Sequence, residues 1–293
     1  MQLSRRLGTV LTALAALVVP LLTGTSTAHA TTPLIYAVLG DSTAAGVGTG
    51  TGPQGSAVFN ASNPSDCKRS TIAYGPLWAA AHSSTYSLPA GQMLACSGAH
   101  TDGQAGAFGK TSTASLNVSD EIALLDPTTR LVSLAVGAND AGFMTLVEAC
   151  AYNLGNCSSD VATAEAFGTS TLIARLESTY QAIHAKAPQA KLVVMGYPLP
   201  YQLNGNCILG GDTNRIQMNN ASNFLDDQVI KVAVNAVGSF ATFADPRPAF
   251  TGHGICSSTP WINSATDDLE GVFHPNYLGH QYGYLPTLTA VTG

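Results

Sequence analysis

The sequence contains few charged residues. Lys and Arg number 12 and Asp and Glu number 18, so charged residues make up 10% of the 293 residues and the formal net charge is -6. A protein that binds nucleic acid needs clustered Lys and Arg on its surface. The composition therefore argues against a nucleic-acid partner, and it predicts a polar surface built mainly from Ser, Thr, Asn and Gly.

After its first thirty residues the sequence has no long apolar run. At the start, Arg5 and Arg6 precede the apolar stretch Leu7–Leu22, and the small-x-small tripeptide Ala28-His29-Ala30 follows it. This order is typical of a secretory signal peptide. We therefore expect residues 1–30 to be removed by a cut after Ala30 and the product to be secreted. An uncleaved membrane anchor is the alternative, although the stretch is short for a membrane span.

The sequence also lacks the spacings that hold metals, because it contains no Cys-x-x-Cys and no His-x-x-x-His. An even number of cysteines in an exported chain favours disulfides over a zinc site. Six cysteines allow 15 pairings. We favour the sequential one, whose shortest loop closes most easily. The predicted bonds are Cys67–Cys96, Cys150–Cys157 and Cys207–Cys256.

No internal repeat or linker is evident after the signal, so we expect residues 31–293 to form one domain. Short apolar runs predict strands at Leu34–Leu39, Gln92–Ala95, Leu131–Val136, Leu192–Met195 and Phe240–Phe243. Helical patterns are present at Gly75–Ser83, Thr163–Ala187 and Asn214–Val237. The alternation of strands and helices predicts an α/β fold, with a parallel sheet between two helical layers.

The spacing of apolar residues predicts which side of each helix is buried. Trp78 is expected to face inward from the first helix. In the two longer helices the expected inward residues are Leu172, Ile173, Leu176, Tyr180 and Ile183, and then Phe224, Leu225, Val229, Val232 and Ala236.

Two stretches rich in Gly, Ser, Thr and Asn, Thr43–Ser70 and Thr101–Ser119, are predicted to be long loops. Loops of this length in a compact domain are often functional. They either shape a substrate cleft or lie on the surface without a role in binding.

Polar turns follow two of the predicted strands. The first strand leads into Gly40-Asp41-Ser42, and a central strand leads into Gly137-Ala138-Asn139-Asp140. Ligands of a parallel sheet bind at the carboxyl ends of its strands, so Ser42 and Asn139 are expected at the same edge. A serine is a weak nucleophile unless a base and an oxyanion site accompany it. His274-Pro275-Asn276 supplies a candidate base.

Together with Cys96-Ser97-Gly98-Ala99, these segments resemble, in their order, the motifs of the SGNH hydrolases, also called the GDSL family of lipases and esterases. The cysteine pattern and the Cys-Ser-Gly-Ala segment are most similar to the secreted actinobacterial branch. The resemblance extends from Ile35 to about Tyr284. It implies a three-layer α/β/α sandwich around a parallel, flavodoxin-like sheet of five strands, and an enzyme that needs no metal or organic cofactor.

The resemblance also implies roles for individual residues. Ser42 attacks the ester carbonyl, while His274 takes its proton and later gives it to the leaving alcohol. The oxyanion hole consists of the backbone N–H groups of Ser42 and Gly98 and the side-chain amide of Asn139. The local turn, rather than acid–base chemistry, is the expected role of Asp41.

The sequence departs from the family pattern next to the histidine. Many members have an aspartate three residues before it, where this chain has Gly271. A backbone carbonyl can hold the tautomer and orientation of an imidazole. We therefore expect a Ser–His dyad in which the carbonyl of Gly271 or Val272 orients the ring of His274. The carboxylates of Asp268 and Glu270 are the alternatives.

The predicted function is hydrolysis of carboxylic esters through an acyl-enzyme, by a secreted monomer that acts on acyl lipids or fatty esters and makes transient contact with a lipid surface. Apolar residues near the motifs either line an acyl groove or belong to the core: Phe143, Met144, Trp261 and Phe273.

The sequence suggests three alternative functions. One is a carbohydrate acetyl esterase of the same fold, and another is a non-catalytic carbohydrate-binding or adhesion module. The third, a flavodoxin-like cofactor binder, would need a phosphate-cradling loop. The only candidate, Gly46–Gly50, leads into a loop rather than a helix, so the fingerprint fails.

Overall fold

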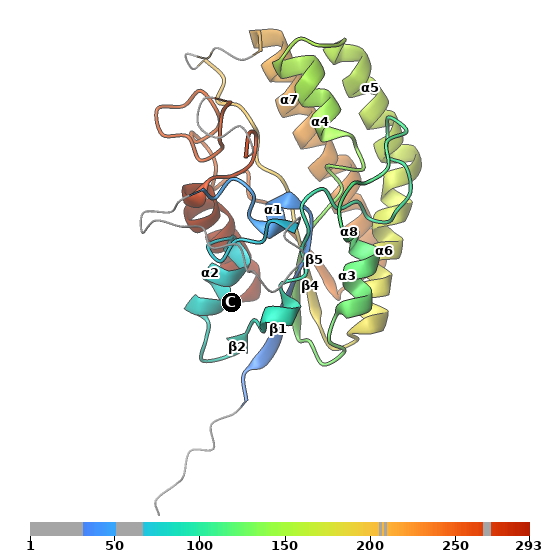
Figure 1. The fold of residues 1–293 in the computed structure, drawn as a ribbon, viewed down its shortest axis with the longest axis vertical. Coiled ribbons are helices and arrows are strands. Elements are labelled where there is room, and N and C mark those ends of the chain that lie inside the picture. Colours follow the sequence, from blue (N-terminus) through green and yellow to red (C-terminus); the bar gives the residue numbers. More distant parts are fainter. Residues whose placement is uncertain (1–31, 51–66, 205–206, 208–209, 266–270) are drawn as a thin grey trace, which may run out of the picture. The chain divides into compact units, whose positions relative to one another are not determined.

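A parallel sheet organises the part of the chain that the computed structural model describes, which comprises residues 32–50, 67–204, 207, 210–265 and 271–293. Its five strands have the order β2-β1-β3-β4-β5 (Figure 1). The strands are β1 (Leu34–Gly40), β2 (Tyr86–Ser87), β3 (Leu131–Ala135), β4 (Lys191–Met195) and β5 (Ala241–Ala244). The predicted signal, Asp268 and Glu270 lie outside the described residues.

Helices connect the strands. The α-helices are α1 (Ser42–Ala45), α2 (Tyr74–Ala81), α3 (Val118–Leu124), α4 (Phe143–Leu146), α5 (Cys157–Phe167), α6 (Ile173–Lys186), α7 (Asp212–Phe224), α8 (Lys231–Val237) and α9 (Leu285–Thr292). A 3₁₀ turn, η2, spans Ala90–Gln92, and π-helical segments are η3 (Val147–Ala151), η4 (Gly168–Leu172), η5 (Leu225–Ile230) and η6 (Gly279–Tyr284). None of the helices within the described ranges is long and apolar enough to cross a bilayer.

Strand β1 shows how the two faces of the sheet are covered. Side chains along a strand alternate between faces. Tyr36 and Val38 belong to one core cluster, with Trp78 of α2 and Leu288 of α9. Residues 37 and 39 belong to the other cluster, with the inward faces of α6 and α8. Figure 1 shows α2 on one side of the sheet and α3, α6 and α8 on the other. The three-layer α/β/α prediction is confirmed.

The sheet order creates a crevice beside the first strand. The chain leaves β1 for β2 on one side, and β3 pairs with β1 on the other. Such a reversal of direction opens a cleft at the carboxyl ends of the strands. Gly40 pairs with Ala135 at those ends. The turns that carry Ser42 and Asn139 therefore start side by side.

The predicted strand Gln92–Ala95 is wrong. Gln92 ends the 3₁₀ turn η2, and the edge strand is the shorter β2. The segment still runs beside β1, but the amides of Leu94 and Ala95 both donate to the carbonyl of Val38. Two successive amides on one acceptor interrupt the regular ladder, as a β-bulge does. Only Met93 forms a bridge, with Val38.

The two long predicted helices are each divided by a π-helical segment. In the first, the predicted residues Leu176, Tyr180 and Ile183 are buried. In the second, Val229 is buried, but Val232 is 41% exposed and residues 233 and 234 are buried instead. A π-helix closes its hydrogen bonds over five residues instead of four. The prediction assumed a regular α-helical period throughout. The π-helical segment η5 departs from that period, and we attribute to it the shift of the buried face of α8 by about one residue.

Disulfides join Cys67 to Cys96, Cys150 to Cys157 and Cys207 to Cys256. No cysteine is free among those the structure describes. The first bond attaches Cys67, near the end of the first predicted long loop, to the segment that contains Gly98.

Candidate active site

The turn after β1 holds Ser42 in a fixed position. Gly40 has a φ of +123°, and a Cβ there would overlap the carbonyl oxygen of Ala135, so the residue must be glycine. The amide of Asp41 donates to the same carbonyl at 2.8 Å. The Asp41 side chain then accepts a hydrogen bond from the Thr43 amide and caps α1. Ser42 is thus the first residue of a short helix at the end of a buried strand.

Ser42 and His274 meet although 232 residues separate them. The Nε2 atom of His274 lies 2.7 Å from the Oγ atom of Ser42. On the other side of the ring, Nδ1 lies 3.0 Å from the carbonyl oxygen of Val272. A carbonyl only accepts hydrogen bonds, so Nδ1 carries the proton and Nε2 accepts the one from the serine. This arrangement suits a general base.

The segment that carries His274 is an irregular loop. Its backbone is tied to Asn263, whose amide donates to the His274 carbonyl and whose carbonyl accepts from the Phe273 amide, both at 2.9 Å. The Asn263 side chain donates to Gly48 at 2.8 Å. Phe273 has a φ of +62°, an uncommon conformation for a bulky residue. The surrounding bonds hold this strained backbone immediately before the histidine.

Gly98 and Asn139 lie on separate turns that border the same pocket as Ser42 and His274. Gly98 has a φ of +82°, and its carbonyl accepts a hydrogen bond from Ser112 at 3.0 Å. The side-chain amide of Asn139 donates to the carbonyl of Ala99 at 3.0 Å. An amide nitrogen has two N–H groups, so one fixes the side chain and the other is available to a ligand.

Asp140 holds the Asn139 turn through hydrogen bonds to the Thr101–Ser119 loop. The carboxylate is fully buried and accepts hydrogen bonds from the Thr101 hydroxyl at 2.7 Å and the Thr101 amide at 3.0 Å. The amide of Ala107 donates to the Asp140 carbonyl at 2.8 Å. Burial raises the pKa of Asp140, and the bonds from Thr101 lower it. The described part of the second long loop therefore supports the site without lining the pocket.

Tyr197 connects the turn that carries Ser42 to the end of β4. Its hydroxyl donates to Asp41 at 2.6 Å, and its amide donates to the buried carboxylate of Asp226. Burial raises the pKa of Asp41 to about 6, and the hydrogen bond from Tyr197 lowers it. The Asp41 side chain accepts hydrogen bonds from the Thr43 amide and the Tyr197 hydroxyl, which are the bonds of a turn residue.

An apolar cavity of about 260 Å³ extends from Ser42 and His274. Its wall combines α4 with the α5–η4 and α7–η5 helices. Three of the four residues considered for an acyl groove, Phe143, Met144 and Phe273, line it. Trp261 is not among its described lining residues and instead stacks on His253, with ring centroids 3.6 Å apart. Ser42 and His274 therefore border a space suited to a hydrocarbon chain.

Sequence reasoning did not identify several residues that position the site. Tyr197 follows the end of β4, so the strand-end rule that found Ser42 and Asn139 was a signal for it. Asn263 and Glu121 gave no such signal, because their roles depend on partners far away in the sequence.

The chain is similar to known lipases over most of its length. Residues 38–282 match the model of the GDSL-like lipase/acylhydrolase family. The chain is 40% identical over 273 residues to Lipase 1 of Streptomyces coelicolor, with 91% of each chain covered.

Two crystal structures are similar over the same region. The extracellular lipase of Streptomyces rimosus is 34% identical, with a TM-score of 0.73 and coverage of 88% of this chain and 100% of that one. Phospholipase A1 of Streptomyces albidoflavus is 36% identical, with a TM-score of 0.72 and coverage of 88% and 99%. The chain therefore belongs to the GDSL-like lipase/acylhydrolase family of ester hydrolases.

Proposed function

We propose that this protein is a secreted serine hydrolase that cleaves acyl lipids or fatty esters through an acyl-enzyme. The observation that carries the proposal is the 2.7 Å contact between Ser42 Oγ and His274 Nε2 in the lining of an apolar cavity. The Streptomyces rimosus relative is an extracellular lipase, which supports export of this protein. We expect the protein to act as a monomer that touches lipid surfaces transiently.

In the acylation step, His274 takes the proton of the Ser42 hydroxyl as its oxygen attacks the ester carbonyl. The negative charge that develops on the carbonyl oxygen is stabilised by the amides of Ser42 and Gly98 and by the Asn139 side chain. Donors already in place are effective because they need no reorganisation during the reaction. When the intermediate collapses, His274 gives its proton to the leaving alcohol.

Deacylation repeats these steps with water. His274 removes a proton from the water, which attacks the acyl carbon, and then returns a proton to Ser42 as the acid leaves. The Val272 carbonyl keeps the proton on Nδ1 throughout, so Nε2 stays available. Glu270→Gln and Asp268→Asn test this orienting role. A loss of kcat beyond a hundredfold in either folded variant would assign the role to a carboxylate instead.

A fluorophosphonate probe tests the chemical class. It reacts with an activated serine, so the adduct is expected on Ser42 and is expected to disappear in His274→Ala. A folded protein that forms no adduct would be a binding module without hydrolase activity. An adduct on another serine would place the nucleophile elsewhere.

The apolar cavity predicts a preference for longer acyl chains. We expect p-nitrophenyl octanoate to be cleaved with a higher kcat/KM than the acetate. A steep preference for acetate would instead favour a carbohydrate acetyl esterase.

Ala221→Leu should reduce turnover of octanoate more than that of acetate, because Ala221 lines the cavity and the larger side chain fills part of it. Ala174→Leu, an exposed position in α6 outside the lining, is the matched control and should leave the profile unchanged.

A further inference from the structure

Glu121 is a buried acidic residue without a role in the proposed chemistry. It lies on α3 and is fully buried, and its Oε2 accepts a hydrogen bond from the Gly40 amide at 2.7 Å. Its other carboxylate oxygen has no hydrogen-bond partner among the described residues. Isolation of a carboxylate from water is unfavourable unless charge and hydrogen bonds compensate it. Such a group, one hydrogen bond from the nucleophile turn, calls for an explanation.

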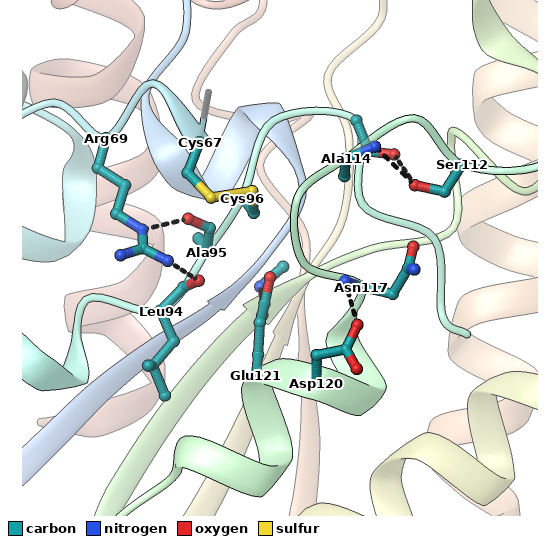
Figure 2. The surroundings of a disulfide bond; sticks show 12 residues. Cys67, Arg69, Leu94, Ala95, Cys96, Ser112, Ala114, Asn117, Asp120 and Glu121 are labelled. Atoms are coloured by element: carbon teal, nitrogen blue, oxygen red, sulfur yellow. Dashed lines mark hydrogen bonds between the residues drawn. A yellow bond between two sulfur atoms is a disulfide. The ribbon is translucent and has the colours of Figure 1, made fainter. Parts of the chain in front are cut away.

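Arg69 supplies the opposite charge from another part of the chain. Its side chain is buried, and it donates from Nε to the Ala95 carbonyl and from Nη2 to the Leu94 carbonyl, both at 2.6 Å. Figure 2 shows these two bonds, with Glu121 extending from α3 toward the same segment. Residues 94 and 95 lead directly into the turn that carries Gly98.

Two further links tie the Arg69 segment to that turn. The disulfide between Cys67 and Cys96 connects the two segments covalently, and the Ser97 amide donates to the Cys67 carbonyl at 3.1 Å. The amide of Cys96 also donates to the Gly40 carbonyl at 2.8 Å. Gly40 thus contacts Glu121 through its amide and the Gly98 turn through its carbonyl.

The charges around Glu121 are consistent with a pair. Burial raises the pKa of Glu121 well above its ordinary value. The Gly40 bond and the charge of Arg69 lower it only in part, and Asp41 raises it further. Burial lowers the pKa of Arg69, and Glu121 raises it. Each group therefore favours the charged form of the other, whereas burial, the larger influence on both, favours their neutral forms.

We propose that Glu121 and Arg69 are positioning residues that act together to set the spacing between the nucleophile turn at Ser42 and the oxyanion donor at Gly98. Glu121 holds the backbone just before the nucleophile, and Arg69 holds the backbone just before the donor. A displacement of about 1 Å in such a site is able to reduce the rate by roughly a hundredfold. The inference rests on the proposed roles of Ser42 and Gly98.

The test compares kcat and KM of Glu121→Gln and Arg69→Met with p-nitrophenyl butyrate. The glutamine keeps an acceptor for the Gly40 amide but removes the charge, and the methionine removes both donors to the Gly98 segment. We expect kcat to fall about 10- to 100-fold in each variant, with KM within about twofold of wild type. Affinity for an alkyl boronic acid, whose tetrahedral serine adduct uses the same donors, should fall in parallel.

The double variant separates a pair from two independent residues. If the residues act as a unit, its kcat should be close to that of the more damaged single variant, whereas independent effects would multiply. Ile183→Ala is the stability control, because Ile183 is buried in α6 and does not line the cavity. It should lower the melting temperature and leave kcat unchanged.

Wild-type kcat in both folded single variants, or multiplying effects in the double variant, would overturn the inference. If Glu121→Gln does not fold, Arg69→Lys decides, because a lysine keeps the charge but not the two-carbonyl geometry. A tenfold loss of kcat supports the proposal, and wild-type kcat contradicts it. An inactive wild-type protein that no fluorophosphonate labels would instead contradict the proposed function.

Discussion

Ser42 and His274, the proposed nucleophile and base, are held by different kinds of structure. Ser42 lies at the end of a buried strand, and its turn is fixed by backbone bonds to the neighbouring strand and by buried carboxylates. His274 lies in an irregular loop that follows a residue of positive φ and is tied to Asn263. One side of the site is therefore part of the sheet, and the other reaches it through loop contacts.

The Ser42 side and the His274 side are joined by a close contact at Gly48. A Cβ on Gly48 would lie 2.8 Å from the Cβ of His274 and 2.7 Å from the Asn263 amide nitrogen. The loop after α1 and the histidine loop are therefore in direct contact, and glycine is needed where they touch. The comparison teaches that the sheet positions Ser42, whereas a few side-chain and backbone contacts bring His274 to it.

The largest effect is expected from loss of either partner. Ser42→Ala and His274→Ala should each reduce kcat by at least about 10⁴-fold, because a serine without its base, or a base without its serine, does little chemistry. The double variant should be no worse than the singles. Steady-state kinetics with an activated ester measures this, and a single variant that keeps a tenth of the activity would break the assignment.

Loss of Asn139, the proposed oxyanion donor on the sheet side, should have the next largest effect. Asn139→Ala is expected to reduce kcat by roughly 10²–10³-fold with little change in KM, because its amide acts on charge that develops only in the transition state. Circular dichroism checks that the fold is intact. An unchanged kcat would remove Asn139 from the oxyanion hole.

Asn263→Ala should weaken the base side selectively. The variant loses the side-chain bond to Gly48, so we expect the His274 loop to shift and kcat to fall about tenfold or more. The unfolding free energy should also fall by about 1–3 kcal/mol, because the Gly48 carbonyl loses a buried donor.

Asn219→Ala is the matched control for this comparison. Asn219 is equally buried and bonds both backbone groups of Tyr201, but it does not line the cavity. It should lower stability without a comparable loss of kcat. If both variants lose activity equally, loop attachment in general, and not the histidine loop, limits the rate.

The last prediction concerns the pH dependence of stability at the Ser42 turn and not the reaction rate. Asp41 has a pKa of about 6 in the folded state and an ordinary value of 3.8. The folded state therefore holds its proton more tightly, so the contribution of Asp41 to stability is fully present below about pH 4 and is lost as the pH rises through about 6.

Asp41→Asn removes this dependence and keeps an acceptor in the turn. Relative to wild type, the variant should gain on the order of 3 kcal/mol of unfolding free energy between pH 4 and pH 7. Denaturant unfolding at both pH values measures the difference. A difference that does not change with pH would show that Asp41 does not titrate as its burial suggests.

Local pattern predicted most of the sheet and part of the site. Four of the predicted strands are present, because apolar runs bounded by turns specify a buried strand with little help from distant residues. The edge strand was misplaced. Both β2 and the predicted segment Gln92–Ala95 lie beside β1, and the predicted segment differs by its bulged hydrogen bonds to Val38. The rotation of the α8 face was missed because a π-helical segment leaves no clear periodic signal.

The sequence alone determined that a serine and an asparagine follow strands of one parallel sheet and lie at the same edge, because the carboxyl ends of parallel strands share one edge. That the two strands are neighbours came from the structure. Only the tertiary structure decided that the Val272 carbonyl faces the imidazole, and that Glu121, Arg69, Tyr197 and Asn263 surround the turns. Strand position depends on hydrophobic pattern over a few residues. A hydrogen bond between groups as far apart as Gly48 and Asn263 depends on how every intervening element packs.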